Sequence, residues 1–157
     1  MTNVGVTGHQ YLPDEVLAHV TTSITAIVAA QPGLIVGYSS LAAGSDQLFA
    51  RILLDAGGVL IAVIPCQGYE KTLSGENLTS YRQLLKRAHK TITLEYTTPS
   101  ESAFMAANEE VIKASDLLIA VWDGLPASGF GGTADAVWLA WSCCKPVVNV
   151  WPKGVSR

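Results

Sequence analysis

Near the end of the chain the sequence reads DGLPASGFGGTAD (residues 123–135), a glycine-rich stretch between two apolar ones. Before it, residues 117–122 form a continuous apolar run, which is typical of a strand buried on both faces. After it, residues 134–141 have the apolar spacing of an amphipathic helix. The sequence here therefore predicts a strand, a glycine-rich loop and a helix in succession.

This succession suits the binding of a phosphate group at Gly131, Gly132 and Thr133. Backbone N–H groups at a helix start attract anions, and the aligned peptide dipoles add to that attraction. Glycine also lets the backbone approach a ligand closely. The alternative is a tight turn in which Thr133 is an ordinary N-cap, and the local sequence is compatible with both.

The composition predicts one compact domain, residues 1–157, with a well-buried core, because 49% of the residues are hydrophobic and only 15% are charged. The net charge is −3 and the ten Lys and Arg residues are scattered. Binding along a nucleic-acid backbone requires clustered positive charge, which the scattered Lys and Arg residues do not provide. We therefore expect a small-molecule ligand and no nucleic-acid polymer as partner.

The cysteines are Cys66, Cys143 and Cys144, and no CxxC or Cys/His metal spacing is present. We therefore expect no metal site, and reduced cysteines in or near the core of a cytoplasmic protein. The first residues lack the basic and apolar regions of a signal peptide, and no apolar run reaches membrane-spanning length. We therefore expect no membrane partner.

Apolar runs alternate with amphipathic segments along the whole chain. Strands are expected at residues 4–8, 34–38, 59–64, 91–96, 117–122 and 145–151. Helices are expected at residues 14–29, from 45 or 46 to 56, 78–88, 100–113 and 134–141. This order predicts an α/β fold: a Rossmann-like three-layer sandwich with a mostly parallel sheet of about six strands.

Details of three helices also follow from the pattern. Asp14 is a plausible N-cap of the first helix, and either Ser45 or Asp46 of the second. Trp138, Trp141 and Trp151 are expected in the core or an interface. Exposed apolar residues on the last helix would favour a homodimer or a higher homo-oligomer. The apolar face of the first helix is expected to consist of Leu17, Val20, Ile24, Ile27 and Val28.

Small and polar residues gather where the expected strands end. In open parallel sheets the ligand crevice lies outside the carboxyl ends of the strands, so these residues are candidate ligand contacts. His9 has an alternative role in a structural hydrogen bond, and Asp46 has one as a helix-start residue. Gly44 and Ser45 stand at a second helix start, which suits another phosphate or a ribose. The full set of candidate contacts is Gly8, His9, Gln10, Ser40, Gly44, Ser45, Asp46, Asp123, Gly124, Gly131, Gly132 and Thr133.

Three motifs in order carry a resemblance to a known group of proteins. They are VGVTGH (residues 4–9), SLAAGSDQLFA (residues 40–50), and ASDL through WDG with GGTAD (residues 114–135). They resemble the SLOG superfamily, which includes lonely-guy phosphoribohydrolases, molybdenum-cofactor carriers and DNA-processing protein A. The resemblance spans almost the whole chain and implies a standalone bacterial nucleotide-binding protein.

The chain departs from the phosphoribohydrolases of that group. Gln10 stands where many relatives carry an arginine, and residues 106–110 lack the arginine that those enzymes use. Of the acidic residues in their last loop, only Asp135 remains. These departures favour a non-catalytic module that binds or senses AMP or an ADP-ribose-like ligand and requires no further cofactor. Two alternatives stay open: a nucleoside 5'-monophosphate phosphoribohydrolase, with Asp135 and Glu109 as candidate catalytic carboxylates, and a carrier of a phosphorylated cofactor.

Overall fold

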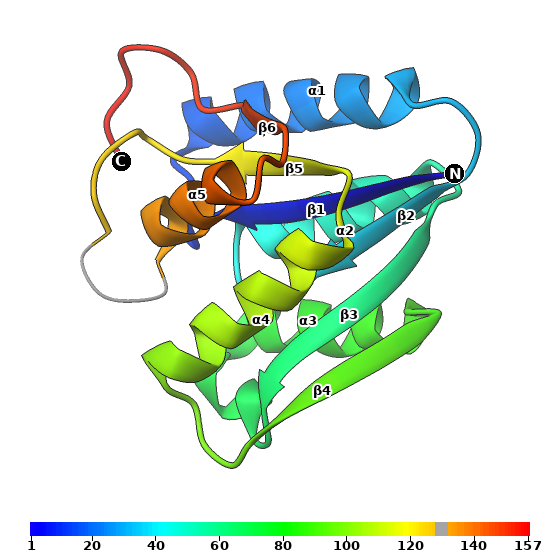
Figure 1. Ribbon diagram of the computed structural model, residues 1–157, viewed down its shortest axis with the longest axis vertical. Helices are drawn as coiled ribbons and strands as arrows, with labels where there is room; N and C mark the ends of the chain where they lie inside the picture. Colours follow the sequence, from blue (N-terminus) through cyan, green and yellow to red (C-terminus); the bar gives the residue numbers. More distant parts are fainter. Residues whose placement is uncertain (128–131) are drawn as a thin grey trace.

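The computed structural model describes residues 1–127 and 132–157. In this part of the chain, strands and helices alternate as the sequence predicts (Figure 1). The strands are β1 (Thr2–Gly8), β2 (Ile35–Ser39), β3 (Val59–Cys66), β4 (Lys90–Tyr96), β5 (Leu117–Val121) and β6 (Val147–Asn149). The helices are α1 (Asp14–Ala30), α2 (Ser45–Asp55), the 3-10 helix η1 (Tyr69–Thr72), α3 (Gly75–Arg87), α4 (Glu101–Ala114) and α5 (Thr133–Ser142).

The strands of the described residues form one sheet in the order β4-β3-β2-β1-β5-β6, and every neighbouring pair is parallel. The α/β three-layer prediction is therefore confirmed, with a sheet that is wholly rather than mostly parallel. The strand order reverses between β1 and β5. This reversal is the point at which open α/β sheets form a ligand crevice.

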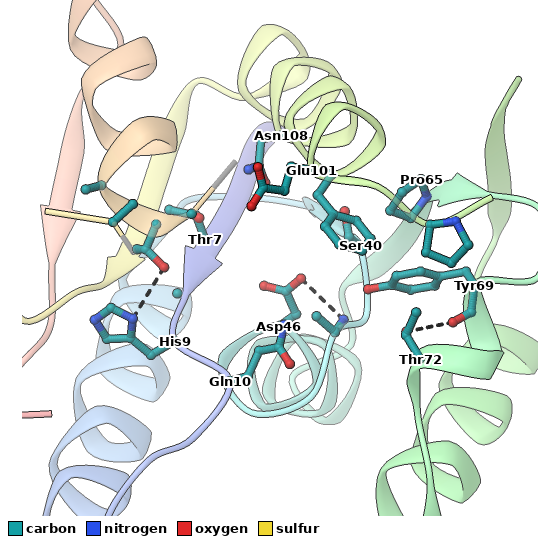
Figure 2. A pocket seen from close by; sticks show the side chains of 18 of the residues that line it. Thr7, His9, Gln10, Ser40, Asp46, Pro65, Tyr69, Thr72, Glu101 and Asn108 are labelled. Atoms are coloured by element: carbon teal, nitrogen blue, oxygen red, sulfur yellow. Dashed lines mark hydrogen bonds between the residues drawn. The ribbon is translucent and has the colours of Figure 1, made fainter. Parts of the chain in front are cut away.

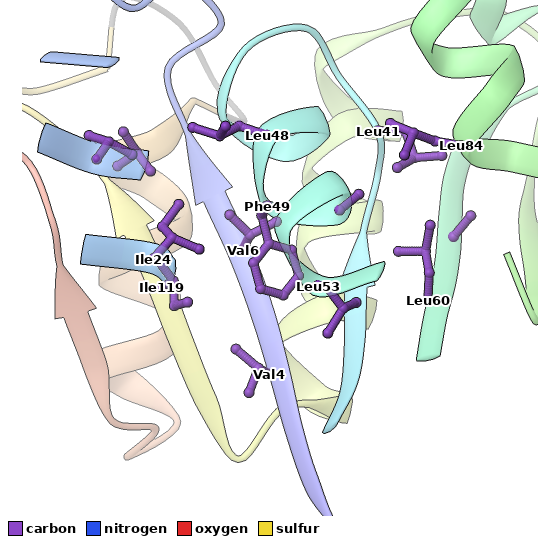
Figure 3. Packing of buried hydrophobic residues seen from close by; sticks show 14 of the residues in the cluster. Val4, Val6, Ile24, Leu41, Leu48, Phe49, Leu53, Leu60, Leu84 and Ile119 are labelled. Atoms are coloured by element: carbon purple, nitrogen blue, oxygen red, sulfur yellow. The ribbon is translucent and has the colours of Figure 1, made fainter. Parts of the chain in front are cut away.

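Helices cover both faces of the sheet. On one face α2 and α3 lie behind the strands, and on the other α4 and α5 lie in front of them (Figure 1). The main core cluster combines residues of β1 such as Val4 and Val6 with Phe49 and Leu53 of α2 (Figure 3). A second cluster joins α4 and α5 to the other face. Gly37 of β2 allows the close approach of α2, because a Cβ atom there would overlap Leu53 and lie 2.9 Å from Phe49 Cε2.

The structure corrects several local predictions. Leu17 is exposed, because the buried stripe of α1 runs through Val16 instead, and both choices satisfy a helical period. Pro13 rather than Asp14 is the N-cap of α1, and Gly44 rather than Ser45 or Asp46 is the N-cap of α2.

Some of the cysteine and tryptophan residues expected in the core are exposed instead. Cys66 is buried, but Cys143 and Cys144 are exposed, because they lie in the turn that follows α5. Trp151 is buried, whereas Trp138 and Trp141 are 49% and 54% exposed. The last strand is shorter than residues 145–151. In the described part of the chain, no helix is long and apolar enough to span a membrane.

Candidate ligand-binding site

A cavity of about 770 Å³ opens at the carboxyl ends of the strands. Its walls come from the ends of β1, β2 and β3, from η1, and from the starts of α4 and α5 (Figure 2). The predicted contacts converge there, although they are spread over more than 120 residues of sequence. Those that line the cavity are Gly8, His9, Gln10, Ser40, Asp46, Gly132 and Thr133.

Gly44 and Ser45 do not face this cavity. Gly44 borders a second pocket of about 460 Å³. Ser45 is fully buried, and both its hydroxyl and its backbone N–H donate to the carbonyl oxygen of His9, at 2.7 and 3.2 Å. A Cβ atom on Gly44 would overlap the carbonyl of Gln10. These two residues therefore pack the first loop onto the start of α2, and neither lines the cavity.

Asp123 and Gly124 lie behind the cavity wall. The Asp123 side chain is 1% exposed, and its Oδ1 accepts the Leu125 N–H at 3.0 Å across a turn in which Gly124 has a φ of 86°. Gly131, the first residue of the predicted phosphate loop, lies outside the described residues. Gly132 is the N-cap of α5 and, because glycine has no side chain, it provides no side-chain cap.

His9 connects the walls of the cavity. Its Nε2 accepts the backbone N–H of Asp123 at 3.1 Å, and its Nδ1 lies 3.5 Å from Thr133 Oγ1 and 3.3 Å from Arg157 Nη1. Burial, reinforced by the Arg157 guanidinium, lowers the pKa of His9, although Asp123 opposes the shift. The His9 ring is therefore neutral at physiological pH. His9 thus makes the structural hydrogen bond expected of it and also lines the cavity, and its contact with a ligand stays a prediction.

Asp46 lies on the floor of the cavity, between His9 on one side and Tyr69 on the other (Figure 2). Its Oδ2 accepts the Ala42 N–H at 3.3 Å, and burial raises the pKa of this carboxyl to about 7. From the same loop, the buried hydroxyl of Ser40 has no hydrogen-bond partner among the described residues. The floor therefore contains a carboxyl group and, beneath the surface, a hydroxyl without a partner among the described residues.

The end of the cavity farther from His9 is more apolar. Tyr69 and Phe104 line it, with their ring centroids 6.3 Å apart and their planes at 65°. Pro65 and Leu73 add apolar surface, while Glu101 on α4 supplies a carboxylate. Sequence reasoning did not include Tyr69, Leu73, Phe104 and Glu101 among the candidate contacts, because η1 and the start of α4 carry no glycine motif.

The candidate catalytic carboxylates do not line the cavity. Glu109 is exposed on α4, and Asp135 is half-buried in the first turn of α5. The carboxylates that do line it are Asp46 and Glu101. Another residue missed from the sequence is Arg157, whose guanidinium lines the cavity beside His9. Among the described residues, no group of three His, Cys, Asp or Glu side chains is placed to hold a metal ion.

Comparison with solved structures places this architecture among known folds. DNA processing protein A from Streptococcus pneumoniae superposes with a TM-score of 0.70 at 20% identity, over 93% of this chain and 49% of that one. DNA processing protein A from Helicobacter pylori superposes with a TM-score of 0.70 at 20% identity, over 93% of this chain and 63% of that one. The molybdenum cofactor binding protein from Rippkaea orientalis superposes with a TM-score of 0.59 at 18% identity, over 93% of this chain and 74% of that one. The chain thus spans about half to three quarters of these proteins. No protein-family model and no curated protein matches it.

These neighbours correct one prediction and confirm another. The exclusion of a nucleic-acid polymer is wrong, because the Helicobacter pylori protein, which has this fold, is described by its single-stranded DNA binding mode. Net charge averages over the whole surface, so a total of −3 with scattered Lys and Arg does not exclude a nucleic-acid partner. The chain shares the Rossmann-like fold of these solved structures, which agrees with the fold that its three loop motifs imply.

Proposed function

We propose that this protein binds a nucleotide or a nucleotide-derived phosphate ligand in the cavity, as a binding or sensing module. One observation carries the proposal. A single cavity joins the start of α5, a floor with a carboxyl and a hydroxyl, and an apolar end with two aromatic rings. Phosphate, ribose and base would occupy these three regions in that order.

The phosphate belongs at the start of α5. The N-cap of this helix is a glycine, which provides no side-chain cap, and Gly132 and Thr133 both line the cavity. The Thr133 hydroxyl points to His9 rather than capping the helix, so the alternative of an ordinary N-cap loses its basis. The N–H groups of a helix start and the helix dipole both favour an anion at this position.

The remaining regions suit the rest of a nucleotide. Asp46 and Ser40 can exchange hydrogen bonds with sugar hydroxyls, as acidic residues do in dinucleotide-binding folds. Tyr69 and Phe104 offer apolar ring surface to a base. A cavity of about 770 Å³ lies within the range of small-molecule sites.

Binding without turnover is favoured over hydrolysis, because Asp135 and Glu109 lie outside the cavity lining. The carrier alternative is kept, because a molybdenum cofactor binding protein has this fold over 74% of its length. Incubation with AMP and GMP, followed by chromatography for free base, tests turnover. Release of base that Asp135→Asn abolishes would establish the hydrolase instead.

Isothermal titration with AMP, GMP, ADP-ribose, NAD and a short single-stranded oligonucleotide tests the proposal. We expect at least one phosphate-bearing nucleotide to bind, and Thr133→Val to weaken it by about 5- to 10-fold, the loss of one hydrogen bond. Thr79→Val is the matched control, because Thr79 is an exposed threonine on α3 that donates to the carbonyl oxygen of Gly75. Absence of binding by every nucleotide, or tighter binding of the oligonucleotide than of any mononucleotide, would contradict the proposal.

A further inference from the structure

We propose that Arg157, at the end of the C-terminal tail, is the residue that supplies positive charge to the phosphate of the bound ligand. This inference rests on the proposed function and names the residue on which the phosphate end depends. It also assigns a ligand-binding role to a tail that carries no motif.

Arg157 reaches the phosphate end directly. The Arg157 Nη1 atom lies 3.3 Å from His9 Nδ1. The same His9 Nδ1 atom lies 3.5 Å from Thr133 Oγ1. The guanidinium, the Thr133 hydroxyl and the start of α5 thus surround one point of the cavity wall. A phosphate placed there meets N–H and O–H donors from two distant parts of the sequence.

An ion pair orients the guanidinium. Arg157 Nε lies 3.2 Å from Oδ2 of Asp123, whose side chain is 1% exposed. Asp123 Oδ2 makes no hydrogen bond among the described residues, so the pair is held by charge rather than by an aligned N–H. The Arg157 side chain remains 41% exposed. Some of the five N–H donors of its guanidinium are therefore available to a ligand.

The tail that carries Arg157 is held in place. Trp151 is buried, its indole N–H donates to the carbonyl oxygen of Val155 at 2.7 Å, and its ring packs edge-on against His9. Val155 also packs on the core. These contacts fix the chain two residues before Arg157, so the arginine does not depend on a ligand to bring it to the cavity.

No other lining residue can supply this charge. Among the described residues that line the cavity, Arg157 is the one Lys or Arg, and Asp46 and Glu101 are acidic. His9 is neutral, because burial and the neighbouring guanidinium lower its pKa. Without Arg157, the ligand's phosphate would meet only uncharged donors and the repulsion of the two carboxyl groups.

The test compares AMP with adenosine, which differ only in the phosphate, by titration against the full chain. Arg157→Gln is expected to weaken AMP binding by about 10- to 100-fold and to leave adenosine binding unchanged. Arg157→Lys should retain part of the AMP affinity, because a lysine keeps the charge without the planar fork. Lys153→Gln, which removes a charge from an exposed position on the same tail, should change neither.

The outcomes separate this inference from the proposed function. Equal AMP affinity in Arg157→Gln and Lys153→Gln would overturn the role of Arg157 and leave nucleotide binding intact. Equal losses for AMP and adenosine would assign Arg157 to structure rather than to the phosphate. Failure of the unsubstituted protein to bind AMP would remove the proposed function itself. Should Arg157→Gln fail to fold, Arg157→Met, which removes the charge and keeps a long side chain, replaces it: a selective loss of AMP affinity supports the inference, and its absence contradicts it.

Discussion

At the scale of single residues, Asp46 is placed at an energetic disadvantage. Its carboxyl is buried with one backbone hydrogen bond, and its pKa rises from 3.8 to about 7. The folded state therefore binds this proton more tightly than the unfolded state does. The stability that the protonated group contributes is present below about pH 4 and is lost as the pH rises through about 7. A residue that lowers the stability of the folded protein at neutral pH and lines a cavity is a candidate functional residue.

The substitution Asp46→Asn is expected to raise the free energy of unfolding by about 4 kcal/mol at most at about pH 8, and by less than half of that, about 1–2 kcal/mol, at about pH 5. The amide keeps an oxygen for the Ala42 N–H but carries no buried charge. Urea unfolding at both pH values measures this difference. His9 titrates in both proteins, so its contribution cancels.

The control is Asp55→Asn, which alters an exposed carboxylate at the other end of the same helix. It should show no such dependence on pH. An equal effect of Asp46→Asn at both pH values would contradict the buried, proton-binding environment of Asp46.

At the scale of elements, the contact between α2 and β2 is expected to depend on Gly37. Gly37→Ala would place a Cβ atom against Leu53 and Phe49, and such overpacking costs about 1–3 kcal/mol. Leu53→Ala removes one of the two obstructing side chains. The double variant should therefore lose less stability than the sum of the two single losses. Additive losses, measured by urea unfolding, would show that α2 does not approach β2 this closely.

The sequence predicts the elements well where their signals are local. Residues 59–64 and 117–122 are continuous apolar runs, and each forms a buried strand. The buried face of α1 does not follow from sequence alone, because Val16 and Leu17 both fit a helical stripe and only packing distinguishes them. Parallel topology also explains why Gly8, Ser40 and Thr133 could be grouped in advance, since strand ends of this kind meet at one edge.

Other parts of the site depend on contacts that no local pattern reveals. Arg157 reaches the cavity through the hydrogen bond between Trp151 and Val155, and the tail has no periodicity. Ser45 looks like a ligand contact beside its glycine, but its hydroxyl is used by the carbonyl of His9. Tyr69 enters the cavity from a 3-10 helix whose sequence resembles an ordinary loop.

At the scale of the whole molecule, α5 and the edge strand β6 present apolar surface. Trp138, Trp141 and Val148 are exposed there. Exposed apolar side chains gathered on one side favour association, so we expect a homodimer through this face. Light scattering after size exclusion should show a dimer that Trp138→Glu shifts to monomer. Leu34→Glu, at an equally exposed leucine before β2, is the control and should leave the dimer unchanged. A monomeric unsubstituted protein would contradict this expectation.

The central claim for the molecule is that one cavity binds a nucleotide by its phosphate at the start of α5. The most direct measurement is isothermal titration of the full protein with AMP and, separately, with adenosine. We predict that AMP binds at least about 10-fold more tightly, because the phosphate adds charge-assisted hydrogen bonds that adenosine lacks. Equal affinities for AMP and adenosine, or no binding of either, would contradict the claim.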